Sequence, residues 1–133
     1  MRRIAATAGV LACFIVAGGA KACDCASLSL SRRFAEADLV LVATVLSHRQ
    51  LEYVTVAPTE IFKGAVATAL TIITGTSDCD YFLPPVSPKV GDEYLLFLRQ
   101  AKGEFSANRC LASGRKGEKA AELRALRKPP GPR

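Results

Sequence analysis

The cysteine pattern constrains this chain more than any other feature, because disulfides can tie a small fold together covalently. Of the five cysteines in the sequence, Cys13 lies in an N-terminal segment that we expect to be removed. The four that remain are Cys23, Cys25, Cys79 and Cys110. An even number of cysteines in a small exported domain predicts two disulfides. A bond between Cys23 and Cys25 would close a strained ring, so each should pair with a distant cysteine, and two such pairings remain open.

The N-terminal segment has the organisation of a secretory signal peptide. Two arginines follow the initial methionine, residues 4–20 carry no charge, and Ala20 and Ala22 supply small residues for cleavage. We expect cleavage after Ala22, so that the mature protein begins with Cys23 and is secreted, or reaches the periplasm or cell surface of a bacterium. A transmembrane anchor would need about 20 apolar residues. Lipidation of Cys23 is a second processing route, although a charged Lys21 is unusual for it.

The positive charge of the chain is concentrated at its two ends. The formal net charge of +6 and the pI near 9.3 at first suggest a nucleic-acid binder. Three positive charges belong to the signal segment, however, and residues 115–133 contain seven basic and two acidic side chains. Residues 23–114 are therefore mildly acidic, and we expect them to bind no nucleic acid. The basic segment predicts either a solvated helix face or contact with a polyanion or an acidic surface.

Short apolar runs separated by turns predict a small β domain with a helix at each end. The first run is continuously apolar and rich in β-branched residues, as in a strand that is buried on both faces. Pro58 in the second run favours an edge or a bulge. The expected strands are residues 39–46, 51–62, 69–74, 93–99 and 103–110, and the expected helices are 32–37, capped by Ser29 or Ser31, and 116–128.

Five short strands fit a five-stranded OB-fold barrel. We expect this domain to span residues 23–114 as a monomer, followed at 115–133 by a basic helix and a disordered tail. The expected loop at residues 75–91 is long for such a domain, so it should either be functional or be held by its disulfide.

Catalytic chemistry is not expected from this sequence. Its one histidine, His48, should lie in the turn between the first two strands. With the mature cysteines paired, neither a Ser-His-Asp nor a Cys-His arrangement can form. We expect no enzyme activity, no cofactor and no metal site of the chain's own. A mature N-terminal Cys23 would nevertheless carry its α-amino group and its carbonyl on one residue, and together these form a five-membered chelate for a metal ion.

Four patches of sequence occur in a particular order. They are Cys23-x-Cys25 after the signal segment, Phe34 before the run 38–43, Tyr53 before Ile61-Phe62-Lys63-Gly64, and Cys79-Asp80-Tyr81-Phe82 before Asp92-Glu93-Tyr94-Leu95, with Cys110 closing the set. In this order and spacing, residues 23–114 resemble the N-terminal inhibitory domain of the tissue inhibitors of metalloproteinases, within the netrin-like module group.

The resemblance implies an OB barrel with disulfides Cys23–Cys79 and Cys25–Cys110. It also implies inhibition of a zinc metalloendopeptidase, in which the α-amino and carbonyl groups of Cys23 cap the zinc of the protease and displace its water. Asp24 would enter the primed-side specificity pocket of the protease. The other contact residues that it implies are Cys25, Ala26, Cys79, Asp80, Tyr81 and Phe82.

The sequence also departs from this family. Ala35 stands where a further cysteine would fall, Asp24 replaces the usual threonine or serine, and Ala26 begins a stretch that lacks the usual proline. A carboxylate is costly in an apolar pocket unless it is paired. The alternative function is therefore a non-inhibitory secreted or cell-surface binding module that uses its basic tail.

Overall fold

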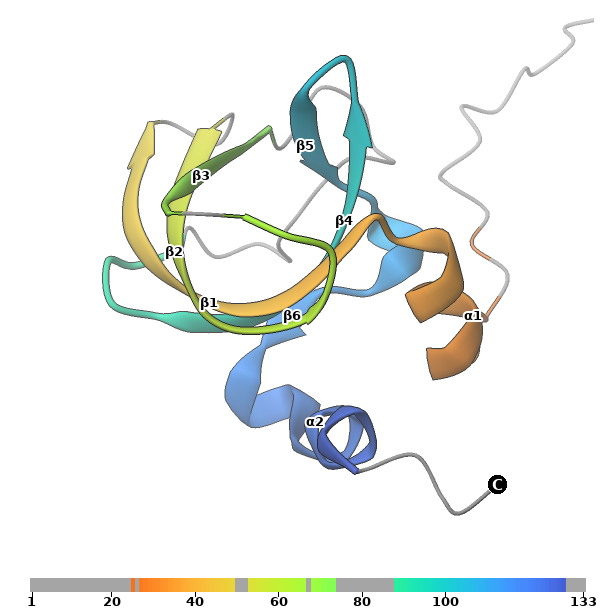
Figure 1. Ribbon diagram of the computed structural model, residues 1–133. Coiled ribbons are helices and arrows are strands. Elements are labelled where there is room, and N and C mark those ends of the chain that lie inside the picture. The colour runs from red at the N-terminus through yellow and green to blue at the C-terminus, as the bar shows by residue number, and fades with distance from the viewer. Residues whose placement is uncertain (1–24, 26, 50–52, 67, 74–87, 129–133) are drawn as a thin grey trace, which may run out of the picture.

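The computed structural model describes Cys25 and residues 27–49, 53–66, 68–73 and 88–128. Its elements, in chain order, are α1 (Leu30–Glu36), β1 (Leu39–Arg49), β2 (Tyr53–Lys63), β3 (Leu70–Ile73), β4 (Glu93–Ala101), β5 (Glu104–Ala107), the 3-10 helix η1 (Arg109–Leu111), β6 (Gly114–Arg115), the 3-10 helix η2 (Lys116–Lys119) and α2 (Ala120–Arg127) (Figure 1).

Five strands form a closed barrel. The hydrogen-bonded order is β1-β2-β3-β5-β4, and a further pairing of β1 with β4 completes the circle. The β3–β5 pair is parallel, and the other barrel pairs are antiparallel. The short β6 adds to β4 outside this circle. The expected OB-fold barrel with a short N-terminal helix and a C-terminal helix is thus confirmed.

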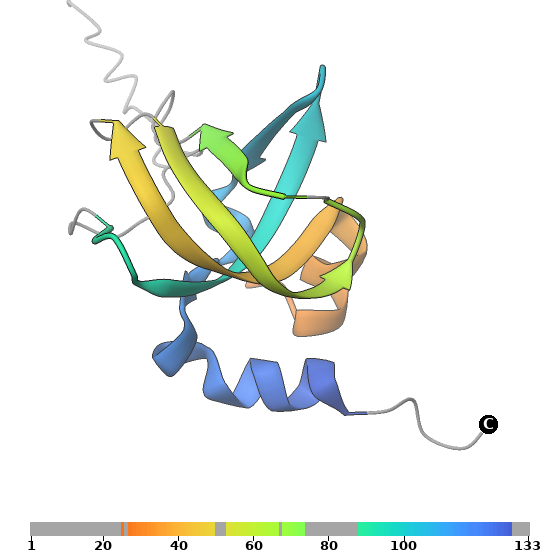
Figure 2. The same cartoon turned by 60° about the vertical axis from the view of Figure 1, so that its left-hand side comes forward.

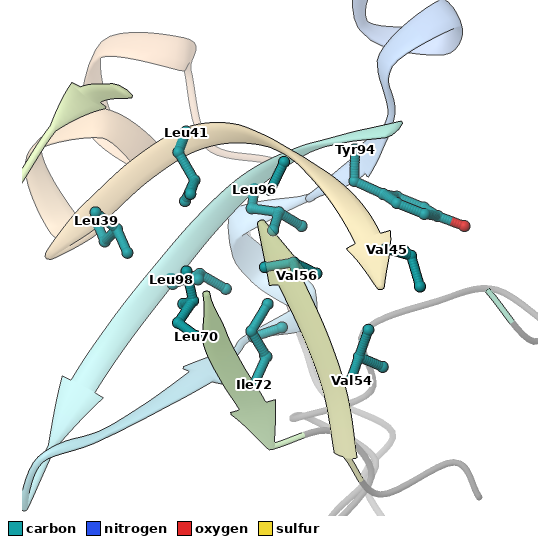
Figure 3. Close-up of a cluster of buried hydrophobic side chains, with 12 residues drawn as sticks. Leu39, Leu41, Val45, Val54, Val56, Leu70, Ile72, Tyr94, Leu96 and Leu98 are labelled. Carbon is teal, nitrogen blue, oxygen red and sulfur yellow. The ribbon is translucent and has the colours of Figure 1, made fainter. Parts of the chain in front are cut away.

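Strand β1 is buried on both faces, as its continuous apolar run predicted. Successive side chains of a strand point to opposite faces, so such a strand contributes to two cores. Leu39, Leu41 and Val45 point into the barrel, where they meet side chains of β2, β3 and β4 (Figure 3). Val40 and Val42 face outward, toward the helices. The strand β4 divides its apolar side chains between the two cores in the same way.

The outer core joins the C-terminal helix to the barrel. Leu123 of α2 is buried to 3% exposure and packs with Val42 of β1 and Phe97 of β4. Figure 2 shows α2 running beside the barrel. Leu126 is partly buried against the same cluster, whereas Ala120 is exposed. The helix of the basic segment is therefore a packed part of this fold.

Three local features test the expected boundaries. Ser29 caps α1, since its hydroxyl accepts from the Arg32 N–H at 3.2 Å. The β1–β2 register shifts opposite Pro58, which confirms a bulge there. The expected turn at 47–50 is wrong in part, because β1 continues to Arg49 and places His48 in a strand opposite Val54. This last portion of β1 is exposed, so no apolar pattern marked it as a strand.

Hydrogen bonds join the last residue of β2 to the C-terminal part of α1. The Lys63 ammonium donates to the Phe34 carbonyl at 2.8 Å and to the Ala35 carbonyl at 3.1 Å, and it lies 5.4 Å from the centre of the Phe34 ring. Gly64 follows with φ +82°, and a Cβ there would lie 2.7 Å from the Asp38 carbonyl oxygen. The Phe-Lys-Gly sequence is thus explained by packing against the chain that leaves α1.

We expect Gly64→Ala to lower the free energy of unfolding by about 2–3 kcal/mol, because alanine adds both a strained φ and a backbone clash. Gly103 is the matched control, since its φ is +79° but a Cβ there meets nothing within 4 Å. Gly103→Ala should cost only about 1 kcal/mol. Urea denaturation measures both values, and equal losses would show that the approach to Asp38 does not matter.

Candidate functional site

The candidate inhibitory site is described at one of its residues, Cys25. The expectations for Cys23, Asp24, Ala26, Cys79, Asp80, Tyr81 and Phe82, and for the Cys23–Cys79 bond, lie outside the described residues. Within the described residues, this site is therefore represented by Cys25 and its bond to Cys110 in η1.

Cys25 is joined to Cys110 by a disulfide with a Cα–Cα distance of 5.0 Å. This bond confirms the pairing that the resemblance implied. Cys110 lies in η1, where Asn108 shapes the turn: its side-chain oxygen accepts from the Cys110 N–H at 2.8 Å and its carbonyl from the Leu111 N–H at 3.0 Å. Leu111 is fully buried in the outer core. The disulfide therefore ties Cys25 to a turn that is itself anchored in the fold.

Arg33 holds that turn in place from the other side. Arg33 is a buried residue, 8% exposed. Its guanidinium donates to the Leu111 carbonyl at 3.3 Å and pairs with Glu122 of α2 at 3.0 Å. It also lies 5.0 Å from the centre of the Phe97 ring, a cation–π contact. One side chain of α1 thus contacts η1, α2 and β4.

Arg33 was not among the site residues expected from the sequence, although its position in the helix carries a signal for burial. In a helix, residues three and four positions apart share a face. Arg33 shares a face with Leu30 and Ala37, which both belong to the outer core. A charged residue on the apolar face of a short helix indicates a buried partner elsewhere in the chain.

Covalent geometry limits how far residue 23 can lie from Cys25. Two consecutive trans peptide units span at most about 7 Å between the Cα atoms at their ends. Within the described part of the chain, no group of three or more His, Cys, Asp or Glu residues could hold a metal ion.

The basic C-terminal segment forms ion pairs with the barrel. Arg127 of α2 donates to the carboxylate of Glu60 of β2 from Nε and from Nη2, the shortest contact being 2.7 Å. Hydrogen bonding from Arg127 lowers the pKa of Glu60, and the same contact raises the pKa of Arg127. Lys116 pairs with Glu93 at 3.2 Å. These pairs are exposed, so each contributes little to stability, but they orient the helix.

Three further cations of the segment are exposed and form none of the ion pairs found among the described residues: Arg115, Arg124 and Lys128. Arg115 still interacts with the barrel, because a hydrogen bond with the Tyr94 side chain is the main reason that its pKa is raised. The expected solvated helix face is therefore one part of the segment, and the barrel-facing ion pairs are the other.

Comparison of the sequence with protein-family models and with curated proteins finds no match. Among the described residues, no helix is long and apolar enough to cross a membrane.

Proposed function

We propose that the protein is a secreted inhibitor of a zinc metalloendopeptidase, acting through the α-amino and carbonyl groups of a mature N-terminal Cys23. The observation that supports this proposal most directly is the Cys25–Cys110 disulfide. It holds the chain two residues after Cys23 against a buried turn. A chain start fixed in this way would be presented to a partner without first having to be ordered.

The chemistry of an N-terminal residue suits zinc. An α-amino group titrates close to neutral pH, so a useful fraction is uncharged and able to donate its lone pair. Catalytic zinc sites keep one coordination position for water or substrate, which a chelating amine and carbonyl can occupy. Restraining the chelate before binding reduces the entropy that is lost on association.

The charge at Asp24 narrows the class of protease. A carboxylate that enters a pocket loses hydration, and the loss is recovered only if the pocket supplies a cation or hydrogen-bond donors. We therefore expect a target whose primed-side pocket is cationic or polar. In the same proposal, Ala26 and the loop residues Cys79, Asp80, Tyr81 and Phe82 would contact the protease beside this pocket.

Adding one alanine before Cys23 is expected to raise the inhibition constant at least about a hundredfold, because the residue replaces the free amine by an amide. The measurement is inhibition of a panel of zinc metalloendopeptidases by the processed chain and by the extended chain. Equal unfolding curves of the two proteins provide the control. Equal inhibition by the two chains would contradict zinc capping.

The second candidate function is a non-inhibitory binding module at an exported surface. The observation that favours it is the group of exposed cations Arg115, Arg124 and Lys128. Deleting the whole segment is a poor test, since Leu123 of α2 belongs to the outer core. Replacing these three cations with glutamine leaves the ion pairs with the barrel in place. A binding module would then lose its partner, whereas an inhibitor would keep its inhibition constant.

A further inference from the structure

A groove lies between the C-terminal helices and the start of β4. It is open to solvent, has a volume of about 540 Å³, and is lined by residues of η2 and α2 together with Glu93 of β4. We propose that this groove binds an acidic peptide segment of a partner protein, with an apolar side chain of the peptide seated between carboxylates. The site uses no residue of the N-terminal segment, so it is independent of zinc capping and gives the second candidate function a location.

The lining residues without charge, which we call the floor, are Gly117, Ala120 and Leu123. A Cβ built on Gly117 would meet nothing within 4 Å, so the space beside this residue is open to a ligand side chain. The φ of Gly117 lies outside the left-handed region, so its backbone conformation does not require glycine.

The charged residues of the lining, which we call the walls, are the cations Lys116, Arg124 and Arg127 and the acid Glu93. Among these cations, Arg124 supplies the charge that the described ion pairs leave uncompensated. Glu93 already pairs with Lys116, and Glu60 already occupies Arg127. Arg124 lies one helical turn before Arg127 and has no ion pair among the described residues. Its planar guanidinium can donate two parallel hydrogen bonds to a carboxylate, as Arg127 does to the two carboxylate oxygens of Glu60.

The combination of floor and walls favours a peptide over a sulfated polysaccharide. A polysaccharide offers anionic groups that any exposed cationic face can receive, and it has no need of an apolar floor. An acidic peptide offers carboxylates to Arg124 and an apolar side chain to the space above Gly117. The chain's own C-terminal residues, 129–133, contain an arginine and no acid, so they do not complement this charge.

The test uses a fluorescein-labelled peptide with four glutamates around a central leucine, and a second peptide with serine in place of that leucine. Fluorescence anisotropy at low ionic strength should show saturable binding of the leucine peptide. Gly117→Leu fills the groove and should weaken this binding about tenfold, and Arg124→Gln should weaken it to a similar extent. The serine peptide should bind more weakly to the unaltered protein.

Two matched controls isolate the groove. Ala121→Leu adds the same side chain at an exposed position of α2 outside the groove, and Arg49→Gln removes an exposed cation at the end of β1. Neither should change binding, and the Ala-extended chain should bind as well as the processed chain. Equal binding by Gly117→Leu and Ala121→Leu would overturn the proposal. Binding of a sulfated oligosaccharide without saturable binding of the leucine peptide would also overturn it.

Discussion

Glu122→Ala should lower the free energy of unfolding by about 3 kcal/mol, because it leaves the buried Arg33 guanidinium without its counter-charge. The side chain of Arg33 is 9% exposed, and that of Glu122 is 24% exposed. After the substitution, Arg33 would keep the Leu111 carbonyl and the Phe97 ring as its described contacts. Neither contact neutralises a full charge that has been removed from water.

Arg33→Met should cost less, about 1–2 kcal/mol, because Glu122 still has Lys119 at 3.5 Å and is nearer to solvent. The double variant should be no less stable than Arg33→Met alone, since neither charge is then buried. Urea denaturation of the four proteins measures the coupling energy of the pair. Glu118→Ala removes an exposed acid from η2 as a control, and we expect a change within about 0.5 kcal/mol. Additive losses at Arg33 and Glu122 would contradict this account.

Removing the Cys25–Cys110 disulfide should have the largest effect on stability. The two cysteines are 85 positions apart, so the bond closes most of the domain into a loop. The chain-entropy account of disulfides gives a loss of about 4.6 kcal/mol for a loop of this length. The measurement is urea denaturation of a variant with alanine at both positions, compared with the oxidised protein.

The same variant separates anchoring from stability. If the protein acts by the proposed zinc capping, Cys25→Ala/Cys110→Ala should lose protease inhibition at a temperature where its barrel is still folded, because the disulfide that would restrain a mature N-terminal Cys23 is gone. Arg33→Met loses stability but keeps the disulfide, so under the same proposal it should still inhibit. Unchanged inhibition by Cys25→Ala/Cys110→Ala would show that the disulfide does not position Cys23.

The barrel was predictable from the sequence because its strands carry local signals. The continuous apolar run of β1 marked a strand with two buried faces, and Pro58 marked an irregularity in β2. The start of α1 was also marked locally, by the Ser29 cap. By contrast, the Cys25–Cys110 pairing came from the resemblance, because the cysteine spacing alone left two choices open.

The contacts around η1 could not be predicted, because they join residues far apart in the chain. Arg33 meets the Leu111 carbonyl across 78 positions and Glu122 across 89. No regular spacing of residues along the sequence encodes these long-range contacts. Strand β6 is too short to show an alternation of polar and apolar side chains. The docking of α2 was missed for a related reason: its charges suggested a solvated tail, while the single buried Leu123 and the ion pair of Arg127 hold it to the barrel.

A strand that is apolar on both faces buries more apolar surface, but its side-chain pattern no longer fixes its register against the neighbouring strands. Where one face is polar, a slip of one residue exposes the apolar set, and this penalty selects the pairing. Along the buried part of β1 that penalty is weak, so polar groups at its ends must set its position against β4. Asp38 fixes the register at one end. Its N–H donates to the Leu98 carbonyl and its carboxylate accepts from the Gln100 N–H, both at 2.8 Å. Val45 fixes the register at the other end through backbone hydrogen bonds with Gly91 and Asp92. The alignment of the buried part of β1 therefore depends on hydrogen bonds at its two ends.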